Sequence, residues 1–291
     1  MRRPQDTTTE TPSRLRARAY PQAWRIAAAG LFSISRVSLP LLLLLVLLAN
    51  DPPVTPLMLL RAVTILVLLP GLAAQLVARA YAAEIVIRGG DLVVRGAELQ
   101  LEIPCRAIEA VAAWRVPLPG PGFSLRLRSG RTLGYGLQGA DPTALLLALA
   151  DGQGVESARA ALRHPNLVYA HARGRRRRWY HFAGKFVVFA LVPAAVLFRA
   201  HQYIAYGGPL GEYYLVGLAA YLKTFGVYWG TLMVYLVLYA SVWRGLAEGA
   251  VLLAAWTAPA RAAGARRAAE IAAAALYYGG VPVLLALRFL A

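Results

Sequence analysis

The sequence has few of the residues on which disulfides, metal sites and acid–base catalysis depend. Its 291 residues include 1 cysteine, 4 histidines and 14 acidic residues. The lone Cys105 excludes an internal disulfide and a zinc site made of several cysteines. The histidines lack metal-ligand spacing, and the Walker A, G-x-S-x-G and H-E-x-x-H motifs do not occur. We therefore expect no catalytic residues, no cofactor and no metal, and the sequence does not point to an enzyme.

Apolar residues dominate the chain instead. Hydrophobic residues make up 58% of it and charged residues 15%, and the mean hydropathy is +0.51. This composition is typical of an integral membrane protein and lies outside the range of soluble globular domains. The net charge of +17 also raises the question of nucleic-acid binding, but no nucleic-acid-binding motif surrounds the basic residues. We expect no nucleic-acid partner.

Five apolar stretches approach the roughly 20 residues that a membrane-spanning helix needs. They cover 31–49, 57–77, 183–203, part of 213–243, and 269–290, and four of them contain a proline, which predicts kinks. The fourth run requires tilt or an outer interfacial turn ending near Gly226. The predicted fold class is an α-helical polytopic membrane protein with about five transmembrane helices. This predicted fold also includes a small cytoplasmic β-rich domain, inserted between helices 2 and 3.

The distribution of Lys and Arg predicts the orientation in the membrane. Segments 1–28, 79–182 and 243–268 carry six, fifteen and four of them, whereas 50–56 and 204–211 carry none. We therefore expect a cytoplasmic N-terminus and a periplasmic C-terminus. All but two of the 31 basic residues are Arg, which fits a GC-rich bacterial genome and hence a bacterial inner membrane. Residues 1–28 are expected to be a basic cytoplasmic tail, disordered over 1–20, and 29–78 a transmembrane hairpin.

Between the second and third helices the apolar period changes to two, which predicts β-strands. EIVIR and LVVR form a hairpin through Gly89 and Gly90, and the strand ELQLEI follows. FSLRLR and RTLGYGL form a second hairpin through Ser129-Gly130. Asp141, with Pro142 after it, then suits the start of the helix TALLLALA.

Over about residues 82–150 these elements resemble the bacterial pleckstrin-homology-like (PH-like) domain of prokaryotic membrane proteins. The resemblance rests on the segment GGDLVVRGAELQLEIPCRAIEAV, in which a strand leads through Ile103-Pro104 to Arg106, Ile108 and Val111. The second hairpin and the helix after it complete the likeness. It implies a seven-stranded fold, of which we count about six strands, so the missing strand is either truncated or recruited from nearby. It also implies a binding or assembly module instead of a catalyst.

Two basic groups are candidate contacts. In PH folds, basic residues near strand-connecting loops hold lipid phosphates. The resemblance therefore implies lipid contacts for Arg126, Arg128 and Arg131. Alternatively, these arginines lie on the solvated face of a strand and bind no lipid. The expected basic linker 151–182 ends in RGRRRRWYHF, where a cluster suits anionic headgroups of the inner leaflet or acts only as a topological stop. Its members are Arg173, Arg175, Arg176, Arg177 and Arg178.

The fourth apolar run carries a heptad of tyrosines, Tyr214, Tyr221, Tyr228 and Tyr235. Such a stripe predicts a helix interface, and the alternatives are a row of hydroxyls along a cavity or a surface for a partner subunit. Gly245 and Gly249 form a G-x-x-x-G step that favours close helix contact.

Charged residues inside the spans suggest an outward-facing anion pocket. Its candidate residues are Arg61, Arg199, His201, Lys223 and Arg288, accompanied by Glu212. The alternative is snorkelling near the helix ends together with an ion pair such as Glu212 with Lys223.

The leading hypothesis is a non-enzymatic inner-membrane accessory, scaffold or assembly subunit with a cytoplasmic PH-like domain over 82–150 and helices 3 to 5 over 183–291. Its expected partners are anionic lipids and other membrane subunits or a second copy. The alternatives are a transporter or lipid-handling membrane enzyme with the outward anion site, and a lipid-sensing signalling module.

Overall fold

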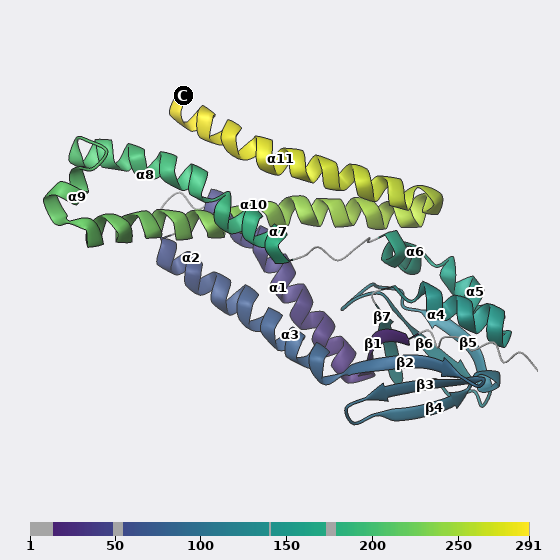
Figure 1. Ribbon diagram of the computed structural model, residues 1–291. Coiled ribbons are helices and arrows are strands. Elements are labelled where there is room, and N and C mark those ends of the chain that lie inside the picture. Colours follow the sequence, from purple (N-terminus) through teal and green to yellow (C-terminus); the bar gives the residue numbers. More distant parts are fainter. Residues whose placement is uncertain (1–13, 49–54, 140, 173–178, 291) are drawn as a thin grey trace, which may run out of the picture. The chain divides into compact units, whose positions relative to one another are not determined.

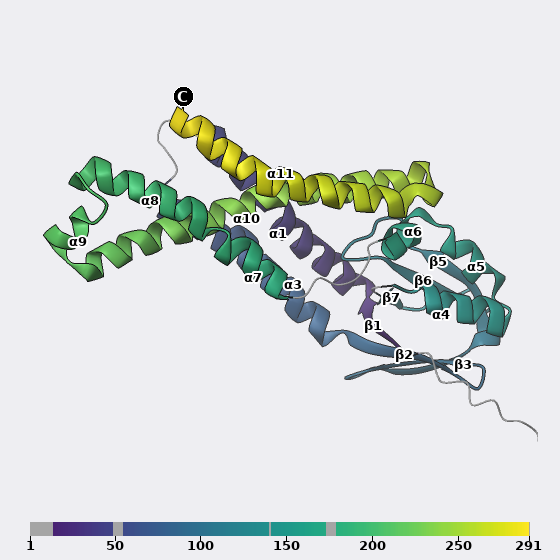
Figure 2. The same ribbon diagram turned by 45° about the horizontal axis from the view of Figure 1, so that its top comes forward.

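The structure is a computed structural model that describes residues 14–48, 55–139, 141–172 and 179–290 (Figures 1 and 2). The chain forms two compact units. The sheet unit consists of Met1–Ser33, Gly71–Arg173 and Ala255–Ala262. The helix unit consists of Ile34–Pro70, Gly174–Ala254 and Ala263–Ala291.

The sheet unit is built on a seven-stranded antiparallel sheet with the strand order β4-β3-β2-β1-β7-β6-β5. The strands are β1 (Arg14–Pro21), β2 (Ala82–Arg88), β3 (Asp91–Gly96), β4 (Gln100–Pro104), β5 (Ile108–Ala113), β6 (Gly122–Leu127) and β7 (Tyr135–Gly139). Both predicted hairpins are present. Gly89, Gly90 and Gly130 in their turns have positive φ angles, a conformation that glycine adopts at no steric cost.

Strand β1 lies in the segment that we expected to be a disordered tail. Leu15, Ala17 and Ala19 face the core and alternate with arginines on the opposite face. Because two of the three inward residues are alanines, the alternating pattern is weak in the sequence. Ala17 pairs with Ala83 of β2 on one side and with Gly139 of β7 on the other, so the N-terminal segment supplies a central strand. Residues 1–13 lie outside the described part of the chain.

The strands continue directly into the first two long helices. β1 ends at Pro21 and α1 (Gln22–Leu48) begins at the next residue, while α3 (Leu69–Ala80) is separated from β2 by Tyr81 alone (Figure 1). The backbone N–H of Ala19 donates to the carbonyl of Tyr81 at 3.0 Å, which extends the pairing to the ends of the helices. The two flanks of the helical hairpin therefore lie on the same side of any membrane that the hairpin enters.

The core of the sheet unit reaches beyond residue 150. Helices α4 (Thr143–Leu147), η3 (Ala148–Gly152), α5 (Glu156–Leu162) and α6 (Pro165–Ala172) follow β7. Leu146, Ala158 and Leu167 from these helices belong to the same buried cluster as Ile85 and Leu125 of the sheet. Residues 151–172, expected as a linker, are therefore part of the folded unit because their apolar positions complete its core.

In the described part of the chain, five helices are long and apolar enough to cross a membrane: Gln22–Leu48, Pro56–Ala80, His181–Tyr206, Leu218–Thr257 and Pro259–Leu287. The second contains α2 (Pro56–Val63), η1 (Thr64–Leu68) and α3; the third contains the end of α7 (Trp179–Ala183), η4 (Gly184–Val188) and α8 (Leu191–Tyr206). The fifth contains the short 3₁₀ helix η5 (Pro259–Arg261) and most of α11 (Ala262–Leu290). The expected number of apolar helices is confirmed.

The fourth apolar run has different ends from those expected. A short helix, α9 (Gly211–Val216), is separated from α10 (Leu218–Thr257) by Gly217, whose φ of 98° breaks the helix. Helix α10 has 40 residues and is about 60 Å long at about 1.5 Å per residue. It passes the expected end at Trp243, so the expected connection 243–268 is helical over most of its length.

Two long helices contain π-helical segments, and neighbouring side chains donate to carbonyls in them. In η1, the carbonyl of Val67 accepts from Ser35 Oγ at 2.9 Å. In η4, the carbonyl of Lys185 accepts from the Tyr277 hydroxyl at 2.9 Å, and that of Val187 accepts from Trp229 Nε1 at 3.0 Å. Backbone groups in lipid need internal partners. These three bonds therefore fix neighbouring helices at positions where the regular bonding pattern changes.

We predict that residues 82–172 do not fold alone, because β2 and β7 then lose their shared neighbour. Joining residues 14–21 to Ala82 through a linker of about four residues restores β1 as one arm of an antiparallel hairpin and should restore cooperative thermal unfolding. Circular dichroism of both fragments measures this. The matched control carries Ala19→Asp in the added strand, which places a charge in the core and should abolish the rescue. Equal folding of all three fragments would contradict the central role of β1.

Candidate functional site

The two predicted basic groups have different positions relative to the described structure. The cluster Arg173 and Arg175–Arg178 lies outside the described residues. Arg126 on β6 forms an exposed ion pair with Glu109 on β5, with Nε and Oε2 3.4 Å apart. Arg128 and Arg131 are exposed in the β6–β7 connection. The arginine at 126 is therefore engaged with the neighbouring strand, as on a solvated sheet face, while the other two remain accessible.

The residues of the predicted outward pocket have separate surroundings. Arg61 and Lys223 are exposed. The guanidinium carbon of Arg199 lies 5.6 Å from the ring centre of Tyr203, and the His201 ring lies 5.4 Å from that of Tyr228. The side chain of Arg288 is not among those described. Within the described residues, no hydrogen bond or ion pair joins these members to one another.

Glu212 is buried in a hydrogen-bonded cluster instead of pairing with Lys223. It is 4% exposed, and its Oε2 accepts from Gln202 Nε2 and its Oε1 from Thr224 Oγ1, each at 2.6 Å. The Glu212 backbone N–H donates back to Gln202 Oε1 at 3.2 Å. These bonds satisfy a buried carboxylate and connect α8, α9 and α10, so this cluster stabilises the turn between the helices.

The tyrosine stripe is interrupted. Tyr214 belongs to α9, which Gly217 separates from the helix that carries the other three tyrosines. The Tyr214 side chain is 75% exposed. The rings of Tyr221 and Tyr228 contact Phe198, with ring centres 4.8 and 6.1 Å away. Tyr235 packs in a cluster with Leu42, Leu59 and Leu238. Three of the four tyrosines thus lie at helix contacts.

The G-x-x-x-G step has no close helix neighbour in the described structure. A Cβ atom at Gly245 or Gly249 would meet nothing within 4 Å.

A buried charge network in the helix unit joins the C-terminal half of α10 to the N-terminal part of α11. Arg266 is 6% exposed and donates to Glu248 Oε2 at 2.7 Å and to Glu270 Oε1 at 2.8 Å. Arg244 completes it through Glu248 Oε1 at 2.5 Å. The two arginines and two glutamates balance in charge. The network was not predicted from the sequence, because residues 243–268 were expected to connect two helices. The i, i+4 spacing of Arg244 and Glu248 is nevertheless typical of an ion pair on a helix.

An aromatic cluster that the sequence analysis also missed surrounds the point where the sheet meets the long helices. We call it the junction cluster and define it as Tyr20, Trp24, Arg25, Tyr81 and Trp114. The ring centre of Tyr81 lies 5.8 Å from that of Tyr20 and 5.9 Å from that of Trp24. The guanidinium carbon of Arg25 lies 4.7 Å from the ring centre of Trp114. The cluster connects the sheet to the first turn of α1 and to the residue after α3.

Trp114 is held in place from several directions. The ring is 7% exposed, and its Nε1 donates to Ser124 Oγ at 3.1 Å. Its carbonyl accepts from Asn166 Nδ2 at 2.5 Å. A Cβ atom at Gly122 or Gly136 would lie 2.8 or 2.6 Å from the ring, so both positions must lack a side chain. Because Gly122 and Gly136 lie well apart from Trp114 in the sequence, no local sequence pattern indicates this arrangement.

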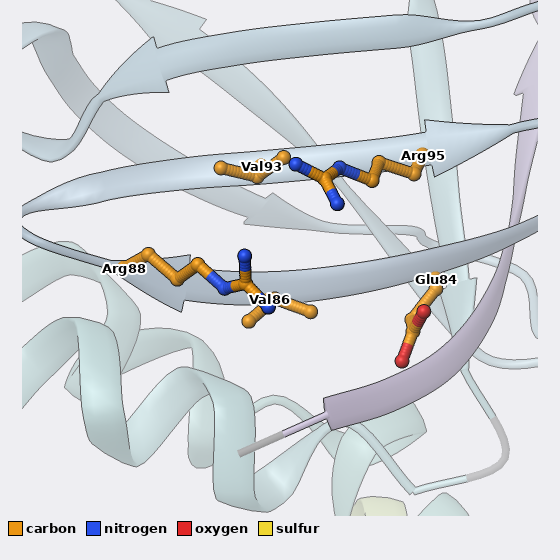
Figure 3. A pocket seen from close by; sticks show the side chains of 5 residues that line it. All are labelled: Glu84, Val86, Arg88, Val93 and Arg95. Carbon is orange, nitrogen blue, oxygen red and sulfur yellow. The ribbon is translucent and has the colours of Figure 1, made fainter. Parts of the chain in front are cut away.

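The outer face of the sheet carries a small hollow lined by Glu84, Val86, Arg88, Val93 and Arg95 (Figure 3). Val86 and Val93 are register partners on β2 and β3 and form an apolar floor, although they point away from the main core. Glu84 pairs in register with both Arg16 and Arg95, which gives a cross-strand row of alternating charge. Opposite charges side by side stabilise a sheet face.

The titratable groups of the sheet unit with shifted pKa values include Cys105, His164 and Asp141. Burial raises the pKa of the Cys105 thiol, and the charge of Asp91 raises it further, which favours the unreactive thiol form. Burial lowers the pKa of His164. For Asp141, burial alone acts to raise the pKa, but hydrogen bonds from Thr143 and the charge of His171 outweigh it and lower the pKa. The N-cap of α4 is Pro142 instead of the predicted Asp141, whose carboxylate lies one residue earlier and accepts from the Thr143 N–H at 3.1 Å. Across the described residues, no three His, Cys, Asp or Glu side chains are grouped to hold a metal.

We predict that Gly136→Ala destabilises the protein by about 1–3 kcal/mol, because its methyl group forces the Trp114 ring out of place. Gly134→Ala is the matched control, since a Cβ there meets nothing within 4 Å. Thermal unfolding of the full chain in detergent, monitored by tryptophan fluorescence, compares the two. Equal stability of both variants would show that Trp114 is not fixed in the described position.

No protein-family model, no curated protein and no solved structure matches the chain. The function of the chain is therefore inferred from its own residues and contacts. Among these, the junction cluster and the continuous sheet are the features that connect the folded β unit with the apolar helices.

Proposed function

We propose that the chain is a non-enzymatic accessory, scaffold or assembly subunit of the bacterial inner membrane, with a cytoplasmic PH-like interaction domain. The observation that carries this proposal is the direct continuation of strands β1 and β2 into the first two apolar helices. A binding domain joined to membrane helices with at most one intervening residue stays close to the membrane surface at which those helices end. That arrangement suits a subunit that holds a partner at the membrane.

The strand count supports the PH-like assignment. The resemblance implies seven strands, and the sheet has seven antiparallel strands, with β1 recruited from before the helical hairpin. An apolar helix follows the last strand, as the resemblance also implies. The inner face is filled by the core and by α4 and α5, so the accessible surfaces for a partner are the outer face and the loops.

The charge distribution supports the proposed orientation. The basic residues gather in the segments that contain the sheet, 1–28 and 79–182, and around the turn from α10 to α11, 243–268, while 50–56 and 204–211 carry none. The positive-inside rule then places the sheet in the cytoplasm and the C-terminus in the periplasm. Anionic lipids of the inner leaflet are proposed partners alongside membrane subunits.

Purification of the tagged full chain from its native membrane in a mild detergent, followed by quantitative mass spectrometry, tests this proposal. We expect at least one membrane protein in near-stoichiometric amount with the wild-type chain. The variant Ala19→Asp should lose this partner, because a charge in the core disrupts the sheet. The matched variant Arg16→Gln changes an exposed side chain on the same strand and should retain the partner.

Two results would contradict the proposal. One is a chain that purifies without any stoichiometric partner, including a second copy of itself. The other is a partner that binds wild type and Ala19→Asp equally, which would place the interaction outside the sheet domain.

A further inference from the structure

We propose that the junction cluster, together with Arg18 and Arg79, binds the phosphate of an anionic phospholipid, with Arg25 as the positioned cation. The inference rests on the membrane placement given under the proposed function and adds a specific lipid site to it. It differs from the cluster at Arg173–Arg178, which lies outside the described residues.

The position of these residues follows from the chain itself. Arg25 lies in the first turn of α1 and Arg79 in the last turn of α3, and both helices are long and apolar enough to cross a membrane. The ends of such helices lie in the headgroup layer, where tryptophan, tyrosine and arginine are preferred. Trp24, which is exposed, and Tyr81, which is half-buried, provide the aromatic side chains at this level.

Two of the three cations have no acidic partner among the described residues. Within the described residues, neither Arg25 nor Arg79 forms an ion pair, and the first turn of α1 contains no acidic residue. Arg18, near the end of β1, adds a third positive charge close to the start of the same helix. Guanidinium groups bind phosphate through paired hydrogen bonds, so a phosphate group matches these arginines in charge and in hydrogen-bonding groups.

Arg25 is also held in a fixed position, unlike an ordinary basic residue at a helix end. Its guanidinium carbon lies 4.7 Å from the centre of the Trp114 ring. That ring is fixed by Ser124 and by the space that Gly122 and Gly136 leave for it. A preorganised cation loses less side-chain entropy on binding. The sheet unit therefore contributes to the lipid site by positioning Arg25, and bound lipid in turn favours the contact between Trp114 and α1.

The test measures how the full chain, reconstituted in phosphatidylcholine vesicles, associates with spin-labelled phosphatidylglycerol and with spin-labelled phosphatidylcholine. We expect wild type to prefer phosphatidylglycerol and Arg25→Gln to bind it about fivefold more weakly, the effect of one basic residue near an anionic headgroup. Arg25→Lys keeps the charge and should retain a larger share of the preference. Arg163→Gln removes an exposed arginine of the sheet unit that does not belong to the junction cluster and should change nothing.

Trp114→Leu tests the positioning, because it leaves every arginine in place. We expect it to weaken phosphatidylglycerol association nearly as much as Arg25→Gln. Should Trp114→Leu fail to fold, the comparison of Arg25→Gln with Arg25→Lys and Arg163→Gln still decides the proposal.

Three results would overturn the inference. They are equal association of wild type with both lipids, an effect of Arg25→Gln no larger than that of Arg163→Gln, and displacement of the labelled lipid by millimolar glycerol phosphate in solution. The last would assign the site to a soluble phosphate compound. Loss of lipid preference in a chain that still purifies with its sheet-dependent partner would refute the lipid site alone, whereas lipid preference without any partner would refute the scaffold role alone.

Discussion

Strand β1 joins the two halves of the sheet by hydrogen bonds, since it pairs with β2 on one side and with β7 on the other. It also runs directly into α1, and β2 follows α3 after one residue. The sheet therefore closes only when the segments before and after the helical hairpin meet on one side of the membrane. Folding of the β unit and insertion of the hairpin are thus coupled by chain connectivity, and the junction cluster forms where the two meet.

Different forces stabilise the two units. The sheet unit has its main apolar core between the strands and the helices α4 to α6, and a smaller buried cluster around Tyr20 and Trp114. The helix unit has small buried clusters, and its specific contacts are polar: side chains that donate to carbonyls of η1 and η4, the Glu212 cluster, and the Arg266 network. In an apolar solvent such polar contacts, more than apolar burial, determine which helices pair.

The sequence allowed prediction of the elements with a strong apolar period and not of those that depend on tertiary context. The five apolar helices, both hairpins and the apolar helix after the second hairpin follow from local patterns, and the described residues contain them, with the helix start two residues after Asp141. Strand β1 was missed because Ala17 and Ala19 carry little hydrophobic signal between arginines. The break at Gly217 separates Tyr214 from the stripe, and the contacts of Trp114 join residues far apart in the chain, so neither could be derived from periodicity.

The most direct test of the shared sheet is disulfide formation between Arg16→Cys and Glu84→Cys in native membranes, in a background with Cys105→Ala. These positions are register partners on β1 and β2. The hydrogen bond from the Ala19 N–H to the Tyr81 carbonyl identifies Ala19 and Tyr81 as a hydrogen-bonded pair of the ladder. Hydrogen-bonded and non-hydrogen-bonded pairs alternate along antiparallel strands, so Arg16 and Glu84 form a non-hydrogen-bonded pair. The short distance between the two residues of such a pair suits a disulfide. The account predicts rapid crosslinking of this pair and little for Arg16→Cys with Arg88→Cys, which is out of register. Equal crosslinking of both pairs, or of neither, would contradict a sheet assembled from both flanks of the hairpin.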